Sequence, residues 1–207
     1  DIARIAGISK RTVSRVINGS GSVGQATRER IESVIREHNF LPDKQARGLA
    51  SKRSYLLGVI YDNPDALYID QVQRGVLGVC TKLGYELVVH PCHWKADDFI
   101  QDCENFIKRS GVDGVLILPP VSESNELAKV LRSRAFPYVR IASSELDEPG
   151  HIVVSRDRIA MEEIAKHLIE LEHTNIKMIS GPMQFRSSVE RMEGFMNALS
   201  NNGCLLY

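Results

Sequence analysis

From residue 55 onward, short apolar runs rich in β-branched residues alternate with longer stretches of helical periodicity. Apolar runs of this length are typical of strands that are buried on both faces of a parallel sheet. Strands are expected at residues 56–61, 86–90, 112–118, 137–142, 152–154 and 176–180. Helices are expected at residues 68–83, 97–110, 125–134, 157–171 and 188–201. This order predicts an α/β fold built on a doubly wound parallel sheet, because parallel strands need crossover connections.

The first 54 residues follow a different pattern, which predicts three short helices. Residues 2–6 suit a first helix, and Gly7 suits a tight connection to the helix that follows. A third helix is expected at residues 25–38, and Pro42 prevents its continuation. The chain therefore begins with a small helical head.

The second of these helices has two chemically distinct faces. Val13, Val16 and Ile17 recur at helical spacing and are expected to point into a small core, with Ser9 as the N-cap. The opposite face carries side chains that bond readily to base edges and phosphates, namely Lys10, Arg11, Thr12, Ser14, Arg15 and Asn18. The pattern predicts a helix-turn-helix with this segment as its recognition helix. The alternative is a basic surface helix with no nucleic-acid partner.

The charge of the chain is divided unevenly between its two parts. The formal net charge is zero, but residues 1–54 carry 11 Lys and Arg against 5 Asp and Glu, whereas the remainder is correspondingly acidic. A basic head on an acidic body is typical of a protein whose head meets a polyanion. Residues 43–54 between them are also basic and could form a short helix. Gly48 weakens that helix by about 1 kcal/mol relative to alanine, so we expect it to need a partner to become ordered.

Other patterns in the sequence have simpler explanations than a site. Four cysteines at irregular spacing, Cys80, Cys92, Cys103 and Cys204, do not form a disulfide framework. Histidines near Cys92 match no usual zinc spacing, and the glycine pattern at residues 19–24 does not follow a strand, so neither a metal nor a nucleotide cofactor is expected. No apolar run has membrane-spanning length, and we expect a cytoplasmic protein.

Several motifs together resemble the lactose-repressor (LacI/GalR) family of bacterial transcription regulators. In the head they are residues 1–3, 6–9, 12–18, 27–30 and 39–42. In the body they are Ser180-Gly181-Pro182 and Arg191-Met192-Glu193-Gly194-Phe195. One departure is Gly24, where the family usually has a capping Ser or Thr.

For the head, this resemblance implies a homodimer that binds a pseudo-palindromic operator in double-stranded DNA. Lys10 and Arg11 would then be the main readers of base sequence, Arg15 a base or phosphate contact, and Thr12, Ser14 and Asn18 supporting contacts. Residues 43–54 would be the hinge helix that folds on DNA. In it, Leu49 beside Ala46 would enter the minor groove and kink the duplex.

For the body, the resemblance implies a periplasmic-binding-protein-like core with a small-molecule effector, a sugar or sugar derivative, in its cleft. The effector residues implied are Asp62, Pro119, Ser143 and Arg191. Asp157 is expected to act mainly as a helix cap. The implied protein is a repressor; a plain sugar-binding receptor and an enzyme are the alternatives, although no catalytic constellation supports the latter.

We expect three regions: a DNA-binding head at residues 1–42, a hinge at 43–54 and an effector core at 55–207. Within the core, a first lobe would span about 55–154 and the start of a second lobe about 155–207. Because the strand–helix pattern stops at Tyr207 with this lobe just begun, we expect the chain to be truncated there.

Overall fold

The computed structural model describes residues 2–17, 21–38, 53–63, 65–202 and 205–206, in two compact units, Asp1–Ser54 and Tyr55–Tyr207. Three of the residues predicted to contact DNA, Asn18, Ala46 and Leu49, lie outside this described part. So does the expected hinge helix, apart from Arg53 and Ser54.

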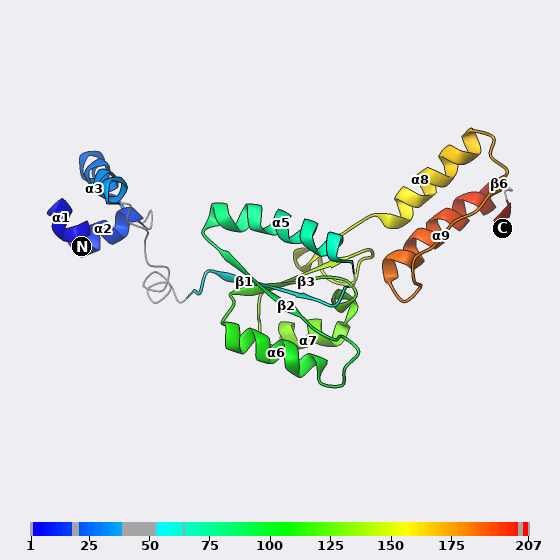
Figure 1. The fold of residues 1–207 in the computed structure, drawn as a ribbon, viewed down its shortest axis with the longest axis horizontal. Coiled ribbons are helices and arrows are strands. Elements are labelled where there is room, and N and C mark those ends of the chain that lie inside the picture. Colours follow the sequence, from blue (N-terminus) through cyan, green and yellow to red (C-terminus); the bar gives the residue numbers. More distant parts are fainter. Residues whose placement is uncertain (1, 18–20, 39–52, 64, 203–204, 207) are drawn as a thin grey trace. The chain divides into compact units, whose positions relative to one another are not determined.

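The first unit contains the three predicted helices (Figure 1). They are α1 (Ile2–Ala6), α2 (Lys10–Ile17) and α3 (Gln25–Glu37). Gly7 connects α1 to α2 with a φ of +65°, a conformation that glycine adopts without steric cost. The helices enclose a small core of apolar side chains: Ile2, Ala6, Val13, Val16 and Ile31.

The second unit is built on a five-stranded sheet in which every pair of neighbouring strands is parallel. Its strands are β1 (Leu56–Tyr61), β2 (Glu86–Pro91), β3 (Gly114–Ile117), β4 (Tyr138–Ala142) and β5 (Ile152–Val154). Their order is β2-β1-β3-β4-β5, so the chain reverses its direction of travel between β1 and β3. This confirms the predicted parallel sheet, and such a reversal is where doubly wound proteins bind ligands.

Helices cover both faces of this sheet, α5 one face and α6 and α7 the other (Figure 1). They span Ala66–Leu83, Phe99–Ser110 and Asn125–Ser133. Side chains alternate along each strand, so Val59 packs in the core under α5, whereas Ile60 packs in the core under α6 and α7. Helix α5 begins two residues before the predicted position because Asp65 caps it, accepting hydrogen bonds from the amides of Leu67 and Tyr68.

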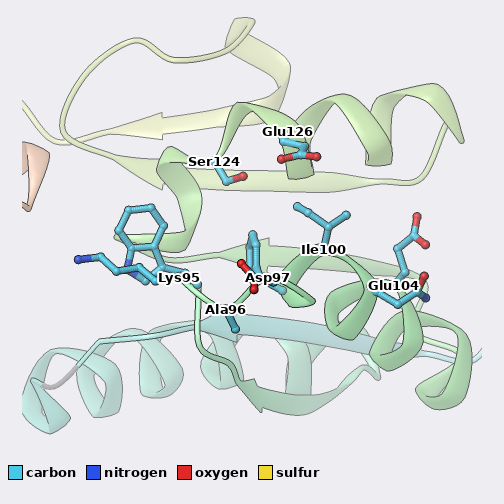
Figure 2. Close-up of a pocket in the computed structure, with 10 residues that line it drawn as sticks. Lys95, Ala96, Asp97, Ile100, Glu104, Ser124 and Glu126 are labelled. Atoms are coloured by element: carbon cyan, nitrogen blue, oxygen red, sulfur yellow. The ribbon is translucent and has the colours of Figure 1, made fainter.

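A cavity of about 510 Å³ opens between the N-terminal parts of α6 and α7 (Figure 2). Lys95, Asp97, Glu104 and Glu126 line it with several apolar side chains. Glu104 is ion-paired with Arg134, so its charge is already compensated. This cavity lies on the α6 and α7 side of the sheet and shares no lining residue with the cleft described below.

Beyond β5 the chain forms two packed helices, α8 (Asp157–Glu170) and α9 (Arg186–Asn201), with two short strands, β6 (Asn175–Ile176) and β7 (Leu205–Leu206). The predicted strand at 176–180 is wrong beyond Ile176. Backbone groups need a neighbouring strand, and β7 pairs with Asn175 and Ile176 alone among the described residues. None of the described helices is long and apolar enough to cross a membrane.

Candidate functional site

Helix α2 presents a basic surface in the first unit. Lys10, Arg11 and Arg15 are exposed, whereas Val13 and Val16 on the other side are 6% and 7% exposed and belong to the core. Ser14 is exposed and Thr12 is half-buried. The apolar stripe of the sequence therefore fixes which way the basic side chains point. They form one accessible surface that is backed by packed aliphatic groups.

The N-terminus of α2 is held in place by its cap. The hydroxyl of Ser9 accepts a hydrogen bond from the Thr12 amide at 3.2 Å and contacts the Thr12 hydroxyl at 2.9 Å. This confirms Ser9 as the N-cap. Helix α3 differs, because its N-cap is Gly24 and makes no side-chain capping bond, as its sequence predicts. Loss of such a bond costs only a few tenths of a kcal/mol when glycine is the substitute, and α3 still forms.

In the second unit, a cleft of about 370 Å³ lies beyond the carboxyl ends of β1, β3 and β4. It therefore sits where the strand order reverses, the position expected for a ligand in this kind of sheet. Residues before β5 contribute Asn63, Asp65, Tyr68, Pro119, Ile141, Ala142 and Ser143. Residues from β5 onward contribute Ser155, Asp157, Gly181, Pro182, Phe185, Ser187, Ser188 and Arg191.

Three of the four residues expected to contact an effector, Pro119, Ser143 and Arg191, line this cleft together. Asp62 does not line it. Its carboxylate accepts a hydrogen bond at 3.0 Å from the backbone amide of Trp94, which packs against the core under α6 and α7. The next residue, Asn63, lines the cleft instead, and its amide donates to the carbonyl of Pro119 at 3.2 Å. This bond ties the end of β1 to the end of β3.

Asp157 is not a helix cap, which corrects the expectation from the sequence. Helix α8 has no side-chain capping bond, and the Asp157 carboxylate accepts hydrogen bonds from Nε and Nη2 of Arg191, both at 3.3 Å. The hydroxyl of Ser155 also donates to it, at 3.0 Å. Arg191 can reach Asp157 because α9, which carries it, packs directly on α8. The two charged groups therefore form one polar unit on the cleft wall.

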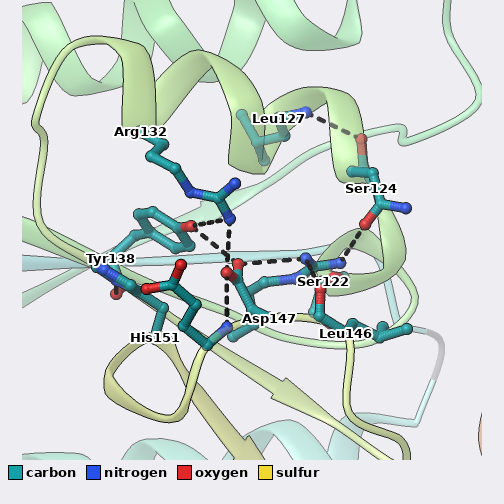
Figure 3. Close-up of polar contacts among 11 residues, drawn as sticks. Ser122, Ser124, Leu127, Arg132, Tyr138, Leu146, Asp147 and His151 are labelled. Atoms are coloured by element: carbon teal, nitrogen blue, oxygen red, sulfur yellow. Dashed lines mark hydrogen bonds and ion pairs between the residues drawn. The ribbon is translucent and has the colours of Figure 1, made fainter.

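A buried network holds the loops after β3 and β4, which carry Pro119 and Ser143 (Figure 3). Its centre is the fully buried guanidinium of Arg140, which donates to the carbonyls of Ser122 at 2.6 Å and Leu146 at 3.0 Å. It also donates to Asn125 at 3.2 Å and pairs with the buried carboxylate of Asp147 at 3.3 Å. One side chain thus joins both loops to β4.

Asp147 is satisfied by several further donors. The Tyr138 hydroxyl and the Glu148 amide donate to it at 2.8 and 3.0 Å, and Arg132 pairs with it at 2.5 Å. Burial alone would raise the pKa of Asp147, but the hydrogen bonds and the neighbouring arginines outweigh it and hold this pKa below its ordinary value. The folded unit therefore favours the charged form of this carboxyl.

We predict that the free energy of unfolding of the second unit falls when the pH drops below about 4. A carboxyl whose pKa is lowered on folding stabilises the fold above its unfolded pKa and loses that contribution as the pH falls through the folded value. Denaturant unfolding between pH 7 and pH 3 measures the effect. The Asp147→Asn variant should lose less stability over this range than the unmodified chain. Equal losses in the two proteins would contradict this assignment.

A second set of ion pairs joins α8 to α9. Arg158 in α8 donates to Glu190 in α9 at 2.7 Å and also pairs with Glu193. Within α9, Arg186 donates to the same Glu190 at 2.8 Å. The hydrogen bond from Arg158 helps to hold the pKa of the buried Glu190 below its ordinary value. The backbone amide of Arg186 donates to Glu123 in the loop after β3, at 3.1 Å. Arg158 and Arg186 are therefore both paired with glutamates, and neither lines the cleft.

Comparison with known proteins identifies the family. The profile described as "Bacterial regulatory proteins, lacI family" matches residues 1–43, and the profile "Periplasmic binding proteins and sugar binding domain of LacI family" matches residues 54–205. The chain belongs to the LacI family. Catabolite control protein A of Staphylococcus epidermidis is 30% identical over 98% of this chain and 61% of its own length. The ribose operon repressor of Escherichia coli is 28% identical with the same coverage.

The fold of this LacI-family chain also matches solved structures. The lac repressor dimer bound to operator and the anti-inducer ONPF superposes with a TM-score of 0.71 at 25% identity, covering 100% of this chain and 62% of that one. The chain thus spans about three fifths of the length of the relatives it matches. Those relatives are regulators, and none of the three is an enzyme by its description.

Sequence reasoning missed several residues of the cleft: Asn63, Tyr68, Ser155, Phe185, Ser187 and Ser188. For Asn63 a signal was present in the alternation of side chains along β1. Val59 and Tyr61 lie on the α5 face of the sheet, and Asn63, two residues further on, is expected on the same face. By the same alternation, Asp62 is expected on the other face of the sheet, toward α6 and α7. The serines and Phe185 had no comparable signal, since they lie in loops or at a helix start whose course depends on packing.

Proposed function

We propose that this chain is the DNA-binding and effector-sensing part of a sequence-specific transcriptional repressor. Lys10, Arg11 and Arg15 would contact base edges and phosphates in the major groove of an operator, supported by Thr12, Ser14 and Asn18. The observation that carries this proposal is the exposed basic face of α2, backed by Val13 and Val16 in a closed three-helix core. Long cationic side chains on a rigid helix are the means by which helix-turn-helix proteins read DNA.

The remaining parts of the proposal follow from the family. Two copies of the protein would bind a pseudo-palindrome in double-stranded DNA in the cytoplasm, at the nucleoid. Ala46 and Leu49 would enter the minor groove between the half-sites. A small-molecule effector, a sugar or sugar derivative, would occupy the cleft between Pro119, Ser143 and Arg191. Its binding would then change the affinity for DNA through reciprocal coupling between the two sites.

The test of DNA reading is the Arg11→Ala variant. The chain is first used to select a binding sequence from a random DNA pool, and affinity is then measured on the selected and on a scrambled duplex. Removal of a bidentate base contact is expected to cost about 1–3 kcal/mol on the selected duplex and much less on the scrambled one. Arg36→Ala, which removes an exposed arginine from α3, is the matched control.

Equal losses on both duplexes would make Arg11 a phosphate contact and refute its role in reading sequence. Salt dependence separates the wider alternatives, because a DNA-binding head loses affinity steeply as the salt concentration rises. A sugar receptor without a DNA-binding role would show no selected sequence and no salt-dependent complex. Failure to select a binding sequence, or a complex that does not depend on salt, would overturn the repressor proposal.

A further inference from the structure

The charges of the cleft carry information about its ligand that the fold alone does not. Of the described residues that line it, Arg191 is the single cation, and Asp65 and Asp157 are the two carboxylates. The remaining lining groups are hydroxyls, one amide and apolar side chains. The described wall of the cleft therefore carries one more negative than positive charge.

The positive charge of Arg191 is already neutralised. Two of its N–H groups point at one oxygen of Asp157, at 3.3 Å, and the Ser155 hydroxyl donates to the other oxygen at 3.0 Å. Burial, and then the carboxylate of Asp157, raise the pKa of Tyr68, which also lines the cleft. A ligand at this wall meets a compensated pair and not a free guanidinium.

Two further arginines of α8 and α9 are already paired with carboxylates. Arg158 is bound to Glu190 and Glu193, and Arg186 is bound to Glu190. The Asp65 carboxylate accepts hydrogen bonds from the first amides of α5 and adds no positive charge to the cleft. A phosphate monoester carries about −1.5 to −2 charge at pH 7, and the one cation among the described lining residues, Arg191, would already be paired with Asp157. Desolvation in the cleft would add to the cost of binding such an anion.

The same groups suit an uncharged polyol. A guanidinium has five N–H donors, so three remain on Arg191 after its bonds to Asp157. Together with the free acceptor capacity of the carboxylate, they offer a donor and an acceptor side by side, as vicinal hydroxyls require. Asn63, Ser143 and Ser187 add polar groups, and Phe185 and Tyr68 offer aromatic surface for the C–H face of a ring.

We propose that the effector of this chain is a neutral, hydroxyl-rich molecule and that Asp157 excludes phosphorylated or otherwise anionic analogues. The inference rests on the proposed effector function of the cleft and adds a charge class to it. Asp157 would act as a specificity-determining residue by compensating Arg191. In the proposal, selectivity results from charge and not from shape.

The test is a calorimetric titration of the full chain with matched pairs: D-glucose and glucose 6-phosphate, D-fructose and fructose 1-phosphate, D-ribose and ribose 5-phosphate. For any pair that binds, the neutral sugar is expected to bind at least about tenfold more tightly than its phosphate, which corresponds to about 1.4 kcal/mol. A phosphate that binds as tightly as its sugar, or more tightly, overturns the inference and leaves the effector function intact. Binding of neither member of any pair overturns the effector function itself, and this inference with it.

The Asp157→Asn variant tests the cause of the selectivity. It removes the compensating charge and keeps the size of the side chain, so the preference for the neutral member should fall by about tenfold or reverse. Asp97→Asn removes the same charge in the cavity on the other side of the sheet and should leave the preference unchanged (Figure 2). An unchanged preference in Asp157→Asn, with the variant folded by circular dichroism, would overturn the role of Asp157.

Discussion

Replacement of Asp147 by alanine is expected to lower the free energy of unfolding of the second unit by about 3–5 kcal/mol. Removal of one partner from a buried ion pair leaves the other charge without compensation in a medium of low polarity. The partner here is Arg140, whose side chain is 1% exposed. The Tyr138 hydroxyl would lose its acceptor at the same time. Denaturant unfolding at pH 7 measures the change.

Arg132→Ala is the matched control for this prediction, because it also removes a partner of Asp147. The Arg132 side chain is 54% exposed, so its charge is solvated and its ion pair should contribute about 0–1 kcal/mol. A loss below about 1 kcal/mol in Asp147→Ala, similar to that in Arg132→Ala, would show that Arg140 finds other partners. The network of Figure 3 would then not fix the loops that carry Pro119 and Ser143.

The parts of the fold that follow from local pattern could be predicted from the sequence. The apolar, β-branched runs predicted the strands of the five-stranded sheet, although the edge strands β2 and β5 contain no fully buried residue. The basic face of α2 followed from the helical spacing of Val13, Val16 and Ile17. The cap at Ser9 followed from its place before the first helical residue. Each of these features depends on residues within a few positions of one another.

The features that depend on tertiary contacts could not be predicted in the same way. Arg140 lies in an apolar run, and nothing nearby in the sequence indicates that its partners come from two loops, at Ser122 and Leu146. Asp157 was expected to be a cap because it begins a helix. Its partner is instead Arg191, 34 positions away, and the packing of α9 on α8 decides that choice. Long-range pairing of this kind has no local signature.

That packing depends on one glycine. An ideal Cβ placed on Gly194 in α9 would lie 2.2 Å from the carbonyl oxygen of Arg158 in α8, and 2.9 Å from its carbonyl carbon. These are backbone atoms, so they cannot rotate away as a side chain can. Gly194→Ala should therefore force the two helices apart and lower the free energy of unfolding by about 3 kcal/mol, at the upper end of typical overpacking costs.

The same separation should also reach the cleft, because Asp157 and Arg191 are carried by the two helices that Gly194 allows to meet. Gly194→Ala is thus expected to weaken effector binding as well as stability. Gly75→Ala in α5 is the matched control, since an added Cβ there meets nothing within 4 Å. That control should stabilise its helix by about 0.5–1 kcal/mol, because glycine in a helix interior is costly. If Gly194→Ala behaved like Gly75→Ala in denaturant unfolding, the close approach of α8 and α9 would not be what sets the geometry of the Asp157–Arg191 pair.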